Sequence, residues 1–444
     1  MTPLFRVFVL LLSALLAGPP LLAQTAGAGS IDGVWQGTAA VRGGARVPIT
    51  LRISGAGASL RVALLNGRAA HPEEARASSA HFVGGELTAT YDSIGRGLKA
   101  TLTDGTLSGT YGPLALGASH GVTTPFTARR VERLADPAAA PNPPDLAGLW
   151  EIAVPGSGGS STWELRIAPA IAGSPVRQAV IQRPDGDTGS LFSVWDGSRY
   201  TFSHYTQSGA ALYSVTPQRD GTLAVKNLIE PTPLPAHAGA APKAVSASRP
   251  AEYIARRPES ASAAAVQAGR ETGVKDPKVP FAFSFPDLSG RVVASTDAEF
   301  RGKVVIVALG GAWCPNCHDE APFLVELYRR YHARGLEIVG LDFEEGDPVS
   351  DAARLRAFIR HYGIPYPMLL AGATDEAAEK LPQTVNLSSW PTSFFLGRDG
   401  LVKEVHSGFA GPANPAGHAA LVREVTALVE KLLADPAART LAGR

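Results

Sequence analysis

The chain has 444 residues, 45% of them hydrophobic, which allows two to four domains with cores of ordinary size. Lysine and arginine number 41 and aspartate and glutamate 40, so the formal net charge of +1 gives no electrostatic reason to expect a nucleic acid as partner. With only two cysteines, the sequence excludes a fold that depends on several disulfides.

Residues 1–23 predict a signal peptide. One positive charge, Arg6, precedes a nearly unbroken apolar run, Val7–Ala17, which is shorter than the roughly 20 residues that span a bilayer. The small residue Ala23 fits a cleavage site, and an uncleaved N-terminal anchor is the alternative. We therefore expect an exported protein of the periplasm or cell envelope, either soluble or tethered at its N-terminus.

The first half of the chain contains an internal repeat. Trp35 in GVWQGTA matches Trp150 in GLWEIAV, and DGTL from Asp104 matches DGTL from Asp220, at offsets of 115 and 116 residues. Short runs of alternating apolar and polar residues, separated by Asn-Gly and Asp-Gly pairs, are typical of antiparallel hairpins. The sequence predicts two β-rich repeat units, each a small sandwich or barrel, at 31–131 and 145–229, with the two tryptophans in their cores.

Residues 230–279 have a different composition. Proline, alanine and serine recur throughout this stretch, which argues against a packed sheet and indicates a linker. Within it, residues 251–257 are the one place where we expect a short helix. A domain boundary is placed here.

Residues 280–434 alternate between strand and helix patterns. KVVIVALG from Lys303 is an apolar run of buried-strand length, the following segment to Gly335 has helical spacing, and LEIVGLDF from Leu336 is a second strand. Residues 351–363 predict a helix, the stretch from Ser393 predicts a hairpin, and the chain closes with an amphipathic helix. The order β-α-β-α-β-β-α predicts an open α/β sheet.

The motif Cys314-Pro-Asn-Cys317-His318 has two chemical interpretations, a c-type haem attachment site and a redox dithiol. Cys314 lies where a predicted buried strand ends and a helix begins, with Pro315 in the first helical turn. The helix N-terminus favours a thiolate, so Cys314 is the expected nucleophile. Cys317, one turn later, is placed to resolve a mixed disulfide.

Three segments carry a family resemblance: FSFPDLSGRVV, GKVVIVALGGAWCPNCHDEAP and SSWPTSFFLGRDG. In these motifs the C-terminal part, from Phe281 to Leu433, resembles the TlpA/ResA-like branch of the thioredoxin superfamily. The resemblance implies that Pro391 is the cis-proline facing the disulfide and that Pro322 bends the active-site helix. The implied site residues are Cys314, Cys317 and Glu320 as catalytic groups and Trp313, Trp390, Pro391 and Thr392 as substrate-binding groups.

One position departs from thioredoxin itself. Thioredoxin has a buried acid six positions before the first cysteine, where this chain has Ala308. Glu320 is therefore our candidate proton acceptor, by position and by the resemblance. The alternative is an ordinary solvated helix carboxylate.

Three competing functions stay open. A c-type haem protein would use His318 as proximal ligand and would need a second ligand such as Met368. A peroxiredoxin-like peroxidase would share the fold, although Gly310 and Gly311 stand where that family holds peroxide. In an envelope binding protein the β-rich units, whose ligand the sequence does not indicate, would carry the main function.

The sequence as a whole favours an exported thiol-disulfide oxidoreductase, acting as a disulfide reductase on cell-envelope proteins through Cys314 and Cys317. Neither a metal nor an organic cofactor is expected, because the scattered histidines lack the spacing of a metal site. Its partners would be protein disulfides, and the resemblance implies a membrane thiol donor that returns the pair to the reduced state.

Overall fold

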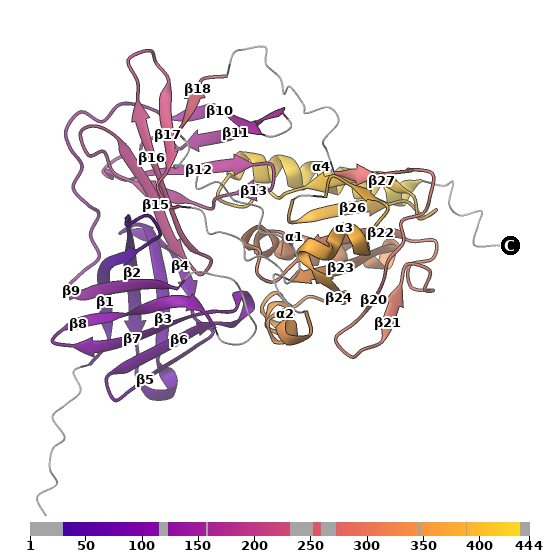
Figure 1. Ribbon diagram of the computed structural model, residues 1–444, viewed down its shortest axis with the longest axis horizontal. Coiled ribbons are helices and arrows are strands. Elements are labelled where there is room, and N and C mark those ends of the chain that lie inside the picture. The colour runs from indigo at the N-terminus through magenta and orange to yellow at the C-terminus, as the bar shows by residue number, and fades with distance from the viewer. Residues whose placement is uncertain are drawn as a thin grey trace, which may run out of the picture. The chain divides into compact units, whose positions relative to one another are not determined.

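The structure is a computed structural model that describes residues 30–114, 123–156, 159–230, 252–258, 272–344, 348–387 and 389–435 (Figure 1). The predicted signal peptide and most of the predicted linker lie outside these ranges. Within them, no helix combines the length and apolar character needed to cross a bilayer.

The first β-rich unit is one antiparallel sheet of nine strands, in the order β4-β3-β2-β1-β9-β8-β7-β6-β5. Its strands are β1 Gly33–Ala40, β2 Arg46–Ser54, β3 Arg61–Arg68, β4 His71–Arg76, β5 Ser79–Val83, β6 Glu86–Tyr91, β7 Arg96–Thr103, β8 Thr106–Pro113 and β9 Thr124–Val131. Every second residue of β2 is buried, including Val47, Ile49 and Leu51, so the alternation in sequence becomes one apolar face. Asp104 and Gly105 form the predicted two-residue turn between β7 and β8, both with positive φ.

The second β-rich unit also has nine strands, in the order β11-β10-β18-β17-β16-β15-β14-β12-β13. They are β10 Gly148–Gly156, β11 Gly159–Ile167, β12 Arg177–Arg183, β13 Gly186–Asp187, β14 Leu191–Ser193, β15 Tyr200–Thr206, β16 Gly209–Pro217, β17 Leu223–Asn227 and β18 Glu252–Arg256. An additional pairing between β11 and β12 closes eight of these strands into a barrel, with β13 outside the ring. The prediction of two β-rich units is confirmed.

Strand β18 corrects the predicted linker. Residues 252–256 form a strand instead of the expected helix, and they pair with both β10 and β17. Without β18 these two strands would leave open edges in the barrel, so the gain from pairing outweighs the weak local helix preference. The second unit therefore extends to Arg256, beyond the predicted boundary at residue 229.

The repeat is visible in three dimensions. The indole N–H groups of Trp35 and Trp150 donate to the carbonyls of Ile31 and Leu146, four residues earlier in each case, both at 2.9 Å. The two tryptophans are 2% and 4% exposed, which confirms that they are core residues. Each repeat unit thus begins with a buried tryptophan that makes the same hydrogen bond.

The two β-rich units share a core within the compact unit formed by Ile31–Arg444. Tyr205 and Leu212, on β15 and β16 of the second unit, belong to the hydrophobic cluster of the first. The Asn66 side chain, on β3, binds the Tyr205 backbone from both sides, donating to its carbonyl at 2.8 Å and accepting from its N–H at 2.7 Å. The two β-rich units therefore pack against each other and are not independent domains.

The C-terminal α/β domain has a five-stranded sheet in the order β24-β23-β22-β26-β27, with β22, β23 and β24 parallel. Its main elements are β22 Val304–Gly310, α1 Pro315–Tyr331, β23 Leu336–Glu344, α2 Pro348–Tyr362, β24 Met368–Ala373, α3 Ala377–Lys380, β26 Thr392–Leu396, β27 Val402–Ser407 and α4 Pro415–Ala434. Short strands β19 Gly273–Val274, β20 Ser284–Pro286, β21 Val292–Ala294 and β25 Thr384–Val385 complete it, and 3-10 turns of the whole chain lie at Gly57–Ser59, Asp92–Ile94, His332–Arg334 and Thr374–Glu376. All the elements of the predicted order are present, but the structure adds β24 and α3 between α2 and the β26–β27 hairpin, which the predicted order lacks.

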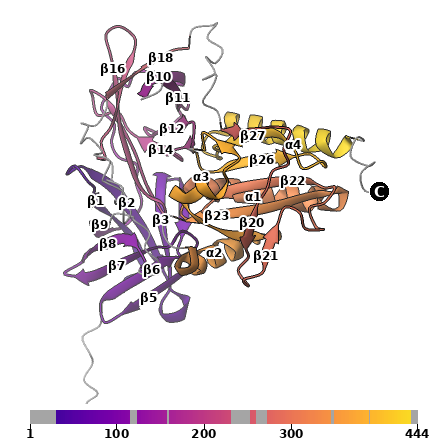
Figure 2. The ribbon, with the colours of Figure 1, turned by 45° about the vertical axis from the view of Figure 1, so that its right-hand side comes forward.

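Other elements of the domain cover both faces of this sheet (Figure 2), each face through its own apolar cluster. Helices α1, α2 and α4 pack on one face through a cluster that includes Leu324, Phe358 and Val429. The β20–β21 hairpin and α3 cover the other face. Because β19 pairs with β25, the domain begins at Gly273, several residues before the predicted start at 280.

Candidate active site

Cys314 lies at the junction between a buried strand and a helix, as the sequence predicts. Strand β22 is buried along almost its whole length, and Cys314 is the N-cap residue of α1, with Pro315 as the first helical residue. The backbone N–H of Cys317 donates to the Cys314 sulfur at 3.3 Å. This hydrogen bond and the other N–H groups in the first turn of α1 direct positive partial charge toward the Cys314 sulfur.

The two sulfurs face different surroundings. Cys314 is 2% exposed and lines a large cleft of about 800 Å³. Cys317 is 6% exposed and lines a separate small cavity of about 30 Å³. Burial, followed by the nearby Cys314 and Glu320, raises the pKa of Cys317 well above its usual value. The geometry therefore supports Cys314 as the attacking sulfur and Cys317 as the internal one.

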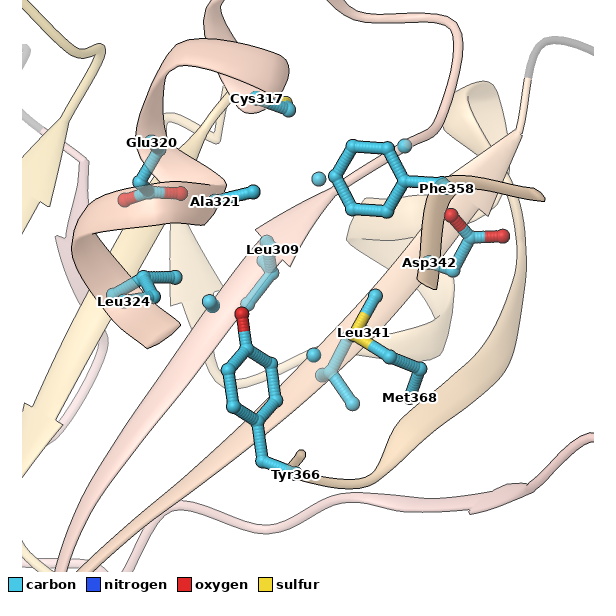
Figure 3. A pocket seen from close by; sticks show the side chains of 14 residues that line it. Leu309, Cys317, Glu320, Ala321, Leu324, Leu341, Asp342, Phe358, Tyr366 and Met368 are labelled. Carbon is cyan, nitrogen blue, oxygen red and sulfur yellow. The ribbon is translucent and has the colours of Figure 1, made fainter. Parts of the chain in front are cut away.

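Glu320 shares the small cavity with Cys317 (Figure 3). Burial raises the pKa of Glu320 to about 7, and the Ser393 hydroxyl donates to its Oε1 at 3.0 Å, which holds the carboxylate in place. The cavity has room for about one water molecule. Glu320 is thus a buried acid that titrates near neutral pH beside Cys317, and the alternative of a solvated helix carboxylate is wrong.

Ala308 lines the same small cavity. It occupies the position where thioredoxin has its buried acid, so in this chain helix α1 supplies the carboxyl group and strand β22 does not. Tyr366 points its hydroxyl into the cavity from the opposite side (Figure 3). Burial raises the pKa of Tyr366, so this hydroxyl stays protonated. It can donate or accept a hydrogen bond at the wall of the cavity.

The aromatic residues before and beside the cysteines form one cluster. The Trp313 indole N–H donates to the Phe343 carbonyl at 2.8 Å, and the Trp313 and Trp390 rings meet edge to face with centroids 6.4 Å apart. A side chain on Gly311 would place its Cβ 2.4 Å from the Phe343 carbonyl, so the close approach of these segments requires glycine there. Both tryptophans line the large cleft, where we predicted substrate contacts.

The Trp390–Pro391 peptide bond is cis, as the resemblance implies. The Trp390 carbonyl lies 3.6 Å from the Cys314 sulfur. Thr392 does not reach the cleft, because its side chain is fully buried and its hydroxyl donates to the Ser389 carbonyl at 2.8 Å. A part for Thr392 in substrate binding, which stays a prediction, would therefore involve its backbone and not its side chain.

His318 has both ring nitrogens engaged. Nε2 lies 2.8 Å from the Ala312 carbonyl and so donates to it, which leaves Nδ1 to accept from the Tyr362 hydroxyl at 2.9 Å. Burial lowers the pKa of His318 to about 4, so the ring is neutral. A ring held in this way is a structural element of α1, and it does not fit the role of a haem ligand.

Sequence reasoning missed a buried ionic cluster beside the active-site loop. Glu344, at the end of β23, accepts from the Ala312 backbone N–H at 3.2 Å and forms an ion pair with Arg354 of α2. Asp342 lies two residues before it on the same strand, and burial together with Glu344 raises the pKa of Asp342 well above its usual value. The signal was present as two acids at alternate positions at the end of a strand whose only other charged residue is Glu337.

Comparisons with known proteins concern the C-terminal domain. Residues 277–405 match the AhpC/TSA family. Thiol-disulfide oxidoreductase ResA of Bacillus thuringiensis (strain Al Hakam) is 32% identical over 122 residues, which are 28% of this chain and 64% of that protein. Thioredoxin-like protein YneN of Bacillus subtilis (strain 168) is 27% identical over 139 residues, 31% of this chain and 75% of that protein. The chain thus spans a little less than two thirds of the ResA relative.

Solved structures align over a similar part of the chain. A thiol:disulfide interchange protein of the thioredoxin family from Chlorobium tepidum TLS is 25% identical with a TM-score of 0.27, covering 36% of this chain and 99% of that one. A thiol-disulfide oxidoreductase from Bacteroides fragilis NCTC 9343 is 17% identical with a TM-score of 0.25, covering 32% of this chain and 96% of that one.

Proposed function

We propose that this protein is an exported reductase of protein disulfides in the cell envelope, on the premise that residues 277–405 form a thioredoxin-like domain of the AhpC/TSA family with a Cys314–Cys317 pair. One observation carries the proposal. The nucleophilic sulfur sits at a helix N-terminus facing a cleft, and its partner sulfur sits one turn later beside a buried acid.

The reaction transfers two electrons to the substrate. The Cys314 thiolate attacks one sulfur of a substrate disulfide, forming a mixed disulfide and releasing the other substrate sulfur as a thiolate. Cys317 then loses its proton and attacks the Cys314 sulfur, which releases the second substrate thiolate. The substrate ends as a dithiol after taking up two protons, and the protein ends with a Cys314–Cys317 disulfide.

Glu320 is the group that would accept the proton leaving Cys317. Cys317 must become a thiolate only in the second step, and its raised pKa keeps it protonated until then. A carboxylate that titrates at about 7 in the same cavity can accept that proton directly or through one water. Glu320 therefore acts as the general base that deprotonates Cys317 when it attacks the mixed disulfide.

The reducing direction is carried over from the resemblance to the TlpA/ResA-like branch, and the reduction potential of the pair tests it. Export is supported by the sequence of residues 1–23, and a reductase in an oxidising compartment needs an external thiol donor, which we assign to a membrane protein.

The test is the equilibrium reduction potential of the purified pair against glutathione. A reduction potential of about −270 mV supports a reductase, whereas one of about −120 mV would make the protein an oxidant. Cys317→Ser should accumulate mixed disulfides with substrate, and Cys314→Ser should not. If hydrogen peroxide oxidised Cys314 faster than a peptide disulfide does, a peroxidase function would replace the reductase.

A further inference from the structure

The large cleft in front of Cys314 has walls from three parts of the compact unit Ile31–Arg444. Its floor is the first turn of α1, with Cys314 and Asn316, and its walls include residues of β4 and of the segment from Arg183 to Gly189. The Asn316 side chain donates to the Asp185 carbonyl at 3.0 Å, so the second β-rich unit contacts the dithiol helix directly. A substrate disulfide must reach Cys314 through this cleft.

The size of the cleft limits what can enter. At about 800 Å³ it lies within the range of sites that enclose small ligands, and a folded domain does not fit inside it. Cys314 is almost completely covered, so a disulfide on the flat surface of a folded protein cannot approach its sulfur. A disulfide in an extended, flexible segment of polypeptide can.

The walls of this cleft carry more acidic than basic side chains. Six carboxylates line it against one arginine, Arg183; the six are Glu73, Glu74, Asp185, Asp187, Glu230 and Asp319. Asp185 is paired with Arg183 at 3.3 Å, and Glu74 is paired with Arg52 and Arg76. Among the residues that the structure describes, the other four carboxylates lie in no ion pair, although Asp187 accepts from the backbone N–H groups of Gly189 and Gly411 and is attracted by Arg183 and His418. Burial raises the pKa of Glu73 and of Asp187.

Two of these unpaired acids come close together near the dithiol. Asp187 Oδ2 accepts from the Gly411 N–H at 2.7 Å, and a Cβ built on Gly411 would lie 2.6 Å from Asp319 Oδ2 and 3.2 Å from Asp187 Oδ2, so both carboxylates lie beside the same glycine. Burial and the charge of Asp187 raise the pKa of Asp319 to about 7. A positive group bound between them would relieve this repulsion, and a negative group would add to it.

We propose that the cleft selects an extended, positively charged polypeptide segment that carries the disulfide. The inference rests on the proposed reductase function and specifies its substrate class. Lysine or arginine side chains beside the substrate cysteines would face the unpaired carboxylates while the disulfide meets Cys314. Acidic disulfides, small or large, would be disfavoured by the same walls.

Three synthetic peptides test the proposal. They have the same length and one internal disulfide, with lysine, serine or glutamate flanking the cysteines. Each is mixed with the reduced full-length protein, and the second-order rate constant is measured by acid quenching and mass spectrometry. At low salt we expect the lysine peptide to react at least about tenfold faster than the glutamate peptide, and at 1 M salt the difference should shrink to less than about threefold.

Glu73→Gln isolates the contribution of the cleft, because β4 belongs to the first β-rich unit and Glu73 is far along the chain from the cysteines. This variant should lower the rate constant for the lysine peptide and raise it for the glutamate peptide, with no change in reduction potential. Glu424→Gln, an equal loss of charge at an exposed position of α4, should keep the wild-type preference. Equal rate constants for all three peptides would overturn the inference and leave the reductase function standing, whereas no reaction with any of them would overturn both.

Discussion

Glu320 and Cys317 line one small cavity, and burial raises the pKa of both groups. The charge of Glu320 adds to the cost of ionising Cys317. A proton that leaves the Cys317 thiol therefore has a nearby acceptor whose affinity for it is tuned by the same burial. In the proposed mechanism this pair acts as a proton relay, in which Glu320 accepts the proton when Cys317 attacks the mixed disulfide.

This relay predicts a specific pH dependence. Below about pH 7 Glu320 is protonated and cannot accept a proton, so the wild-type rate of resolution should rise with pH and level off above about 7. Glu320→Gln should slow resolution by about 100-fold and should show no inflection near pH 7. The measurement is the release of the second chromophore when the reduced protein reacts with an aromatic disulfide reagent.

Two comparisons make this result specific to Glu320. Glu326→Gln changes an exposed carboxylate of the same helix and should leave the profile unchanged. Asp319 also has its pKa raised to about 7, so Asp319→Asn must be measured alongside. An inflection that survives in Glu320→Gln but disappears in Asp319→Asn would reassign the base.

At the scale of elements, helix α2 and strand β23 hold the loop that leads into the dithiol helix. Arg354 of α2 pairs with Glu344 at the end of β23, and Glu344 in turn accepts from the Ala312 N–H, two residues before Cys314. Both members of the pair are buried. Removing one partner of a buried pair leaves the other charge uncompensated, which is costly.

Arg354→Leu should lower the free energy of unfolding by about 3–5 kcal/mol, because Glu344 would keep a buried charge without this partner. Urea unfolding followed by circular dichroism measures the change. As a control, Lys403→Ala removes one partner of the partly exposed pair with Asp399 and should cost no more than about 1 kcal/mol. Equal losses in the two variants would show that the buried pair has no special role.

The elements that could be predicted are those whose conformation depends on residues close by in the sequence. Strand β22, the start of α1 at Cys314 and the Asp399-Gly400 turn all follow from periodicity and capping within a few residues. The pair of Arg354 and Glu344 joins two elements, and nothing in either segment alone specifies the other. Strand β18 was missed for a related reason, since its conformation is imposed by the two strands that it joins.

At the scale of the whole molecule, the sequence repeat predicted two similar units but not that they share a core. Offsets along the chain show that two segments are alike and say nothing about which surfaces meet. Tyr205 of the second unit packs into the cluster of the first, whereas the described cluster of the second unit contains no residue of the first. The duplicated units have therefore acquired distinct roles, one supplying the β15–β16 hairpin and the other receiving it.

The shared core predicts that the two β-rich units lose stability together. Leu212 is on β16 but is buried in the cluster of the first unit. Leu212→Ala should lower the free energy of unfolding by about 2–5 kcal/mol, as buried leucine truncations do, and should increase amide hydrogen exchange in β2 and β3 as well as in β16. Leu223→Ala is the matched control, because Leu223 is equally buried but belongs to the barrel's own core. Its effect on exchange should stay within the second unit, and the same restriction in Leu212→Ala would contradict a shared core.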